Sequence, residues 1–400
     1  MTTRLNARAL VVLAAVVAST AGVLVTVAPN GDAAASAAAN ASTNGTPGAV
    51  YAMTNERDGN RIFVYDRHAD GTLAAPRPFD TGGSGSGLID QSGNSLVLAG
   101  GNFESSQQNV GGSTQFLFTV NTGSNSVTSF RLKSGDPVIA DVEGGLDHPI
   151  SVTYSKHRLF VLNAGAQSCQ GSNPTITGFT VAGDGELTPI PGSTREVPGG
   201  PESGCTMISF NPRGDVIVVT EKLADLIISY RVTREGIPSA PLVNNTTGVD
   251  PFAFSFTRQG QLITAENYNS LGGGVSTYDV PDSGVLVPIS PSVLNGRSDS
   301  CWVVITNNEK YFYVSNAVSG DVTSYTLDND GNIALLDPIA GDVGPMAFDE
   351  ALSGDSKYLY VRSVTLGTIV AFAIQQDGSL IKIQTIGGLP PGSAEGLAAR

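Results

Sequence analysis

One short phrase recurs seven times along this chain. It consists of a β-branched residue, any residue, a small or β-branched residue, and an aromatic residue. The copies lie at positions 62–65, 127–130, 176–179, 227–230, 275–278, 322–325 and 369–372. An apolar, strand-like run precedes each copy and ends on a polar or hydroxyl residue: Asn55, Asn121, Asn163, Glu221, Glu266, Asn316 and Ser363. Each repeat therefore contains at least two predicted β-strands, joined by a short turn.

The spacing of the repeats predicts the fold. Successive run ends are 42 to 66 residues apart, the narrowest step being Asn121 to Asn163 and the widest Asn55 to Asn121. In the sixth copy, positions 311–316, 322–327 and 333–336 form three predicted strands, with a tight turn at Asp330-Gly331. Periods of about 50 residues with several strands each are typical of propellers. The sequence predicts an all-β, seven-bladed β-propeller of four-stranded antiparallel blades.

Each blade also needs an innermost strand along the axis. Candidate segments lie at 150–154, 207–210, 252–256, 302–306 and 350–352. The first blade has none at its own start, whereas 395–400 (EGLAAR) supplies one at the far end. We therefore expect the C-terminal strand to join the first blade and close the ring, which removes exposed sheet edges. Polar, glycine-rich insertions at 101–114, 167–174 and 196–204 are expected to be loops at the rims.

The N-terminal segment is not expected to belong to the propeller. Arg4 and Arg8 precede an uncharged apolar run at 9–29, the arrangement of a signal peptide. The run is long, so an uncleaved membrane anchor is the alternative. We divide the chain into a signal peptide or anchor at 1–29, a disordered linker at 30–48 and the propeller at 49–400. The protein is expected to be secreted.

Composition excludes several classes of partner. The formal net charge is −14 and the pI is about 4.6, so no basic stripe is available for nucleic acid or an anionic membrane surface. We expect no nucleic acid partner, no membrane contact beyond the N-terminal run, and a monomer. The three cysteines and three histidines match no metal motif, so no metal site is predicted. Cys169 and Cys205 are expected at the same rim, where a disulfide could join them; Cys301 is expected to be a buried thiol.

The polar run ends supply the candidate site. In a propeller these ends meet at one rim, and we expect them to form a ring near the axis. Glu221 and Glu266 would act there as general acid and base or hold a hard cation, and the remaining members would bind a ligand: Asn55, Asn121, Asn163, Asn316 and Ser363. The alternative is that these side chains cap turns and bind neighbouring backbone groups. His148, just before Pro149, is the histidine placed to reach the same pocket; its alternative is an exposed loop residue.

No cofactor is predicted. The run at 328–332 (DNDGN) resembles part of a calcium loop, but position 339 is Ile where such a loop has Glu, and turn chemistry explains the run. A Ca²⁺ ion therefore has no support beyond this partial match.

The repeated phrases resemble those of the seven-bladed propeller lactonases, the group of phosphogluconolactonase and the carboxymuconate cyclases. The resemblance spans roughly 49–400 and rests on phrases such as LFVLNAG at 159–165, YFYVSNA at 311–317 and YLYV at 358–361. It is closest to exported bacterial-type members, through the segments at 250–267 and 300–316. It implies a catalytic Glu after a strand, which Glu221 matches.

The chain departs from that family at two places. The resemblance implies an Arg-His pair before the inner strand, where this chain has 205–208 (CTMI), and a His two residues after a Pro, where Ser151 follows Pro149. The sequence thus leaves two functions open. One is an exported lactonase-like or cyclase-like enzyme with a degraded catalytic set, acting on a small lactone or carboxylate. The other is a non-catalytic secreted propeller that binds a ligand or a protein at its loop rim.

Overall fold

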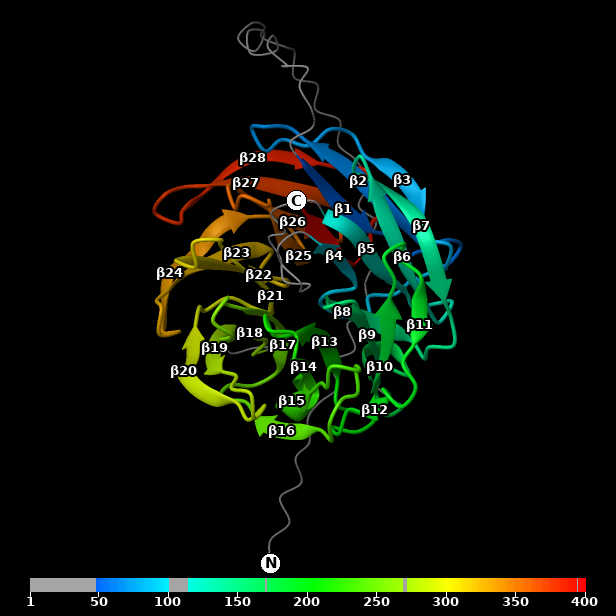
Figure 1. The fold of residues 1–400 in the computed structure, drawn as a ribbon. Helices are drawn as coiled ribbons and strands as arrows, with labels where there is room; N and C mark the ends of the chain where they lie inside the picture. Colours follow the sequence, from blue (N-terminus) through cyan, green and yellow to red (C-terminus); the bar gives the residue numbers. More distant parts are fainter. Residues whose placement is uncertain (1–47, 101–113, 170, 269–271, 394) are drawn as a thin grey trace, which may run out of the picture. The chain divides into compact units, whose positions relative to one another are not determined.

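The computed structural model describes residues 48–100, 114–169, 171–268, 272–393 and 395–400. The expected signal peptide, most of the expected linker and nearly all of the insertion at 101–114 lie outside these residues. Within them, seven antiparallel sheets surround a central axis (Figure 1). The prediction of a seven-bladed, all-β propeller is confirmed.

We number the blades along the chain and give their strands from the axis outward. Blade 1 contains β29 (Leu397–Ala399), β1 (Gly48–Met53), β2 (Arg61–Arg67) and β3 (Arg77–Asp80). Blade 2 contains β4 (Leu96–Gly100), β5 (Thr114–Asn121), β6 (Ser126–Lys133) and β7 (Asp136–Glu143). Blade 3 contains β8 (Pro149–Ser155), β9 (Arg158–Asn163), β10 (Thr175–Val181) and β11 (Leu187–Pro189), and β12 (Arg195–Glu196) also pairs with β10.

Blade 4 contains β13 (Cys205–Phe210), β14 (Val216–Glu221), β15 (Leu226–Arg231) and β16 (Leu242–Asn245). Blade 5 contains β17 (Pro251–Phe256), β18 (Leu262–Glu266), β19 (Gly274–Asp279) and β20 (Val287–Leu294). Blade 6 contains β21 (Ser300–Ile305), β22 (Tyr311–Asn316), β23 (Asp321–Leu327) and β24 (Ile333–Asp342). Blade 7 contains β25 (Ala347–Leu352), β26 (Tyr358–Ser363), β27 (Thr368–Ile374) and β28 (Leu380–Ile386).

The helices of the described residues are two 3₁₀ turns, η1 (Gln167–Cys169) and η2 (Lys222–Ala224). None of the described residues forms a helix long and apolar enough to span a membrane.

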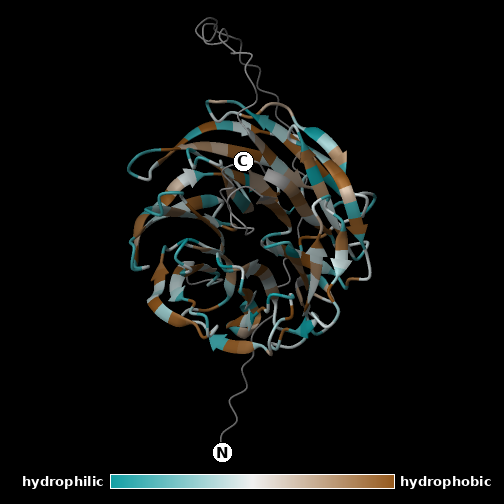
Figure 2. Cartoon of the chain, viewed as in Figure 1, coloured by the Kyte–Doolittle hydropathy of each residue, from teal (hydrophilic) through white to brown (hydrophobic). Residues whose placement is uncertain are grey.

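The recurring aromatic residue of each repeat is buried between blades. All seven copies are at most 2 % exposed: Tyr65, Phe130, Phe179, Tyr230, Tyr278, Tyr325 and Phe372. The tyrosine hydroxyls reach the preceding blade, as when Tyr230 donates to the carbonyl of Glu196 at 2.7 Å. Apolar and polar residues alternate along the strands, and the outermost strands carry most of the exposed positions (Figure 2). The phrase that identifies the repeat is therefore the one that packs neighbouring blades together.

The ring is closed as predicted, by pairing of the two ends of the propeller. Strand β29 pairs antiparallel with β1, with Ala398 opposite Tyr51. Beyond the pairing, the Arg67 guanidinium donates to the carbonyl of Arg400 from Nε at 3.2 Å and from Nη2 at 3.1 Å. The last strand of the chain is thus the innermost strand of the first blade.

The five predicted inner strands are present and each begins one to three residues earlier than expected, β21 also ending one residue short, whereas the inner strand of blade 2 was not predicted. Strand β4 follows a polar stretch without proline and leads directly into the insertion, so its five residues gave no clear signal. Strand β24 is also longer than expected. Its pairing with β23 continues past position 336, through two register shifts, to Asp342 opposite Asp321.

Removing residues 397–400 should strongly destabilise the propeller. The truncation leaves β1 unpaired on one side and exposes the site of Leu397, which is buried. Loss of one buried leucine alone costs about 2–5 kcal/mol, so the unfolding midpoint in urea should fall by an amount equivalent to at least about 3 kcal/mol. Ile381→Ala, at an outer position that is 53 % exposed, should change it little. Equal midpoints for the truncated and full chains would contradict closure.

Candidate functional site

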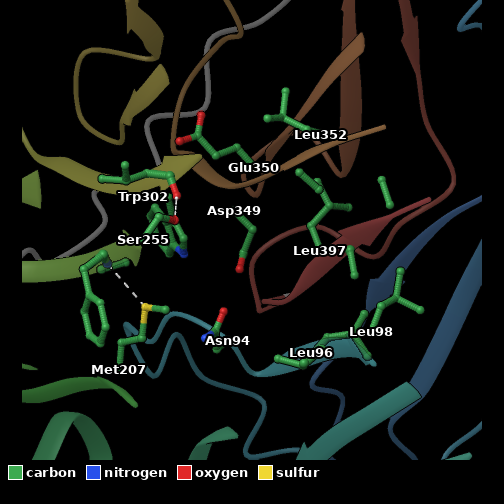
Figure 3. A pocket seen from close by; sticks show the side chains of 17 residues that line it. Asn94, Leu96, Leu98, Met207, Ser255, Trp302, Asp349, Glu350, Leu352 and Leu397 are labelled. Carbon is green, nitrogen blue, oxygen red and sulfur yellow. Dashed lines mark hydrogen bonds between the residues drawn. The ribbon is translucent and has the colours of Figure 1, made fainter. Parts of the chain in front are cut away.

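The inner strands of six blades line a cavity at the axis (Figure 3). It encompasses about 660 Å³ of space not filled by protein, part of it open to solvent. Most of the lining residues are apolar, although polar and apolar atoms share the exposed surface about equally, and the inner strands that supply them are β4, β13, β17, β21, β25 and β29. The apolar lining residues include Leu96, Leu98, Met207, Phe254, Trp302, Leu352 and Leu397. The acidic lining residues are Asp349 and Glu350, both on β25.

The main chain before β4 contacts the next two blades of the ring. The Gly93 N–H donates to the Thr206 carbonyl at 3.1 Å, and Ser151 Oγ donates to the Gly93 carbonyl at 2.6 Å. A Cβ at Gly93 would lie 2.9 Å from Met207 Sδ, so glycine permits this close approach. The segment therefore joins blade 2 to blades 3 and 4 beside the axis.

This arrangement is a departure from the sevenfold pattern. In blades 3 to 7, a residue with positive φ precedes the inner strand, and its carbonyl accepts the N–H of the residue after the second strand. These five residues are His148, Gly204, Asp250, Asp299 and Met346. In blades 1 and 2 the corresponding carbonyls belong to Gly396 and Ser95. They accept hydrogen bonds from the N–H groups of Met53 and Val120, which lie within the second strand rather than after it. The preceding residues of these two blades are consequently free to make other contacts.

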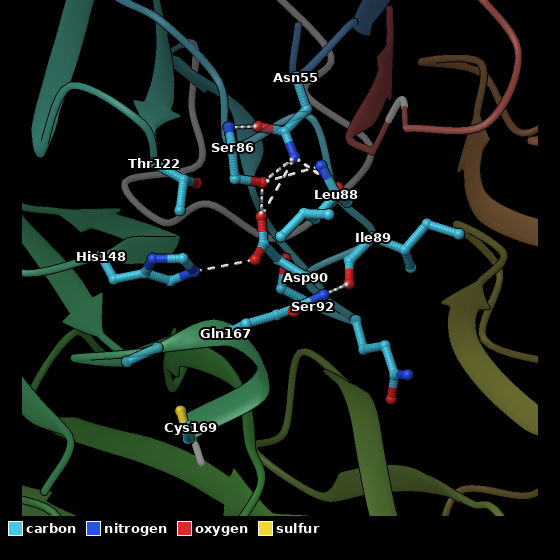
Figure 4. A network of polar contacts seen from close by, with 12 residues as sticks. Asn55, Ser86, Leu88, Ile89, Asp90, Ser92, Thr122, His148, Gln167 and Cys169 are labelled. Carbon is cyan, nitrogen blue, oxygen red and sulfur yellow. Dashed lines mark hydrogen bonds and ion pairs between the residues drawn. The ribbon is translucent and has the colours of Figure 1, made fainter. Parts of the chain in front are cut away.

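His148 is held by a carboxylate from this irregular segment (Figure 4). Its Nε2 lies 2.9 Å from Asp90 Oδ1. The other oxygen, Asp90 Oδ2, accepts hydrogen bonds from Ser86 Oγ at 2.6 Å and from Asn55 Nδ2 at 3.1 Å. The Asp90 side chain is 2 % exposed and that of His148 is 20 % exposed. A buried, doubly anchored carboxylate thus orients a histidine that solvent can reach, and no described residue is hydrogen-bonded to its Nδ1.

Lys222 contacts the same segment from blade 4. Its Nζ donates to Gln91 Oε1 and lies 5.4 Å from the centre of the Phe252 ring. The Gln91 N–H in turn donates to Glu395 Oε1 at 2.9 Å, and Ser92 Oγ donates to Glu395 Oε2 at 3.2 Å. Residues 90–92 therefore connect a histidine, a lysine and a buried glutamate from three other blades.

Burial raises the pKa values of several carboxyl groups around the axis. It raises the pKa of Asp349 to about 6, against the positive charge of Arg362, and raises those of Glu350 and Glu395 well above the usual range. Arg362 is itself fully buried, and its Nη1 donates to the carbonyls of Met53 and Gly396. At Asp349 the positive charge of Arg362 opposes the effect of burial, because it favours the ionised carboxylate.

A β-bulge lies beside the two acids of the cavity. Side chains alternate between faces in a regular strand, but the register of β25 against β26 shifts between Ala347 and Glu350. Asp349 points into the cavity in Figure 3. The carboxyl group of Glu350 lies near Ser315 of the neighbouring blade, which donates a backbone hydrogen bond to it.

The ring expected from the strand ends is present as a set of buried residues, but none of its members is among the residues that line the axial cavity. Asn121 accepts from Thr81 Oγ1 at 2.6 Å and donates to Thr128 Oγ1 at 2.8 Å, and Asn316 makes similar contacts with Asp321 and Thr323. Asn163 donates to Thr175 and Thr177, and Ser363 Oγ donates to the Pro345 carbonyl. Asn55 alone of the predicted ligand-binding residues joins the Asp90–His148 network.

Glu221 and Glu266 hold the loops that enter their own blades. Both are fully buried. The Gly199 N–H donates to both Glu221 oxygens, at 3.1 and 3.0 Å, and Ser276 and Ser292 hydroxyls donate to Glu266. A Cβ at Gly199 or Gly248 would collide with the respective carboxylate, so each loop approaches its glutamate through a glycine. Burial raises both pKa values, partly offset by these hydrogen bonds.

Cys169 and Cys205, the pair expected from the sequence, form a disulfide with their Cα atoms 5.4 Å apart, and Cys301 is a buried free thiol. The disulfide ties the η1 loop to blade 4, and Gln167 of that loop donates to the Ile89 carbonyl at 3.2 Å. No group of three or more His, Cys, Asp or Glu side chains in the described part of the chain could hold a metal ion.

Of these residues around the axis, the sequence singles out His148 but not Asp90, Lys222, Asp349, Arg362 and Glu395. A signal was present for two of them. Asp349 stands beside Glu350 in an inner strand whose other residues are apolar, and Glu395 opens the strand expected to close the ring. No local pattern marks Asp90, because its significance depends on a contact with a residue 58 positions away.

Replacing Asp349 by Asn should alter how stability depends on pH. The folded-state pKa of about 6 exceeds the ordinary value of 3.8, so the acid contributes stability below pH 3.8 that is lost as pH rises through 6. The shift corresponds to about 3 kcal/mol. Asp349→Asn should therefore match the wild type near pH 4 and be more stable at pH 7.5, as measured by urea unfolding. Asp58→Asn, at an exposed loop acid, should show no such divergence; a constant difference for Asp349→Asn would refute the assignment.

Searches for related proteins give no match to a family model and none to a curated protein. Solved structures with the same fold do match. The periplasmic gluconolactonase of Pseudomonas aeruginosa is 17 % identical, with a TM-score of 0.67 over 88 % of this chain and 98 % of its own. Two Bacteroides proteins with the provisional name 6-phosphogluconolactonase are also 17 % identical. The B. uniformis structure has a TM-score of 0.66 over 87 % of this chain and 98 % of its own, and the B. fragilis structure 0.64 over 89 % and 99 %. The chain therefore has the seven-bladed propeller fold that these lactonase structures share.

Proposed function

We propose that this protein hydrolyses a small lactone or a related carboxylic ester, using His148 as the general base. The observation that carries the proposal is the 2.9 Å contact between the partly exposed His148 and the buried carboxylate of Asp90. This is the base–orienter arrangement of hydrolytic sites, in which the carboxylate selects the tautomer and stabilises the imidazolium. The shared fold with lactonase structures supports the choice of substrate class.

The reaction requires no cofactor. With Nε2–H donated to Asp90, Nδ1 of His148 can accept a proton from a water molecule that attacks the lactone carbonyl. The ring C–O bond then breaks, and the leaving alkoxide takes the proton from His148 to give the open hydroxy acid. Lys222, attached to the same segment through Gln91, supplies a positive charge for the oxyanion or for a substrate carboxylate.

Glu221 takes a different role from the one expected from the family resemblance. Its full burial and its two contacts with Gly199 support a function in holding the loop at 196–204. The proposed site thus differs from the family pattern, since the base is supplied by a residue before the inner strand of blade 3.

Activity should depend on His148 and Asp90 but not on the other histidine with the same backbone geometry. His148→Asn should lower kcat/KM for glucono-δ-lactone by about 100-fold or more, and Asp90→Asn by at least about tenfold. His157→Asn is a matched control, because both histidines have positive φ, which Asn tolerates well, and His157 is exposed. Acid release is followed in a pH-stat, with spontaneous hydrolysis subtracted.

Glu221→Gln separates this proposal from the alternatives. It should retain activity while lowering stability. Loss of activity in Glu221→Gln with full activity in His148→Asn would assign the base to Glu221. Absence of turnover in the wild type with lactones of several ring sizes would overturn the enzymatic proposal and leave the non-catalytic one.

We also infer that the protein is exported with its N-terminal run removed. Support comes from the arginines and apolar run at 4–29 and from the Cys169–Cys205 disulfide, since disulfides persist mainly in oxidising compartments. Intact-mass analysis of protein from the culture medium should give a chain that begins between residues 27 and 48. Full-length protein retained in the membrane fraction would instead indicate an anchor.

A further inference from the structure

The axial cavity contains a buried carboxylate without a complete set of partners. Asp349 is 3 % exposed and points into the cavity in Figure 3, and its Oδ2 has no hydrogen-bond partner among the described residues. An unpartnered charged oxygen in an apolar setting is costly, so native proteins normally provide a partner or bind one. Neither His148 nor Asp90 lines this cavity.

The charges around the cavity favour a positive partner. Asp349, Glu350, Glu395 and Asp90 are each at most 3 % exposed, and the buried cation among them is Arg362. Arg362 does not reach Asp349 within ion-pair distance, and no lysine, arginine or histidine lines the cavity. A monovalent cation next to Asp349 would therefore place a positive charge in contact with its carboxylate, where Arg362 does not reach.

The wall distinguishes an organic cation from a metal ion. A hard metal ion needs about six oxygen ligands, whereas most side chains here are apolar or aromatic. The Trp302 ring lies within an aromatic cluster, 5.1 Å from the ring centre of Phe252 and 4.7 Å from that of Phe348. Aromatic faces attract cations, and leucine and methionine side chains accommodate an alkyl group.

We propose that the axial cavity binds a small primary amine in its ammonium form, with Asp349 as the counter-ion and the alkyl part against Leu96, Met207 and Leu397. The site is independent of the lactone chemistry proposed for His148. An ammonium group donates the hydrogen bond that Asp349 Oδ2 lacks, and its charge offsets that of the carboxylate. A water molecule would meet the first requirement but not the second.

The protein has a built-in reporter, because its single tryptophan, Trp302, lines the cavity. Titration with n-propylamine at pH 7.5 should change the fluorescence saturably, at micromolar to millimolar concentration, and should raise the melting temperature. 1-Propanol, which has the same shape without the charge, should bind at least tenfold more weakly. Affinity for propylammonium should also fall as pH decreases from 7.5 to 5, since protonation of Asp349, whose pKa burial raises to about 6 beside Arg362, Glu350 and Glu395, removes the charge of its carboxylate.

Asp349→Asn should weaken the binding of propylammonium at least tenfold, whereas Asp58→Asn, which makes the same change of charge at an exposed loop, should leave it unchanged. Circular dichroism of the ligand-free variants checks that they are folded. Trp302→Phe is a second variant, which keeps an aromatic side chain in the cavity wall; propylamine should still raise its melting temperature. Equal responses to propylamine and 1-propanol, or an unchanged response in Asp349→Asn, would overturn the proposal. So would the absence of any saturable change, which would indicate a cavity filled by water alone.

Discussion

The ring depends on hydrogen bonds from buried tyrosines to the glycine of the next blade's outer hairpin. Tyr51 donates to the Gly135 carbonyl at 2.8 Å, Tyr313 to Gly378 at 3.0 Å, and Tyr360 to Gly71 at 2.9 Å. A Cβ at Gly71 would lie 2.2 Å from the Tyr358 ring, so a larger residue could not approach this closely. The Tyr360 contact runs from blade 7 to blade 1, across the junction that β29 also closes. These three contacts fix neighbouring blades against each other, including the first blade against the last.

The candidate chemistry lies where this regularity fails. Five blades begin their inner strand with the same backbone conformation and the same contact to the residue after the second strand, whereas in blades 1 and 2 the contact is made to a residue within that strand. That difference lets Asp90, Gln91 and Glu395 approach residues of other blades. The Asp90–His148 site therefore lies where the pairing of the inner and second strands departs from the repeat.

The fold was largely predictable because its signals are local. The alternation within each strand, the glycine turns and the sevenfold spacing could all be recognised over a few residues, and closure followed from counting inner strands. The site was less accessible. The polar ends of the second strands share a position because they share a structural task, as the contacts of Glu221 with Gly199 and of Asn121 with Thr81 illustrate. Their recurrence therefore accompanies contacts to neighbouring loops and turns, which a local pattern alone does not distinguish from a ligand site.

The sequence by itself determined the strand module, the number of copies and the partnership of the two chain ends, since each depends on patterns that neighbouring residues carry. Only the tertiary structure decided which polar side chains meet. His148 contacts Asp90 from the neighbouring blade, and Asp349 lines the axial cavity opposite strands of five other blades. Both contacts depend on how one strand is positioned relative to another. The residues involved are far apart in the chain, so no local sequence pattern predicts that they meet.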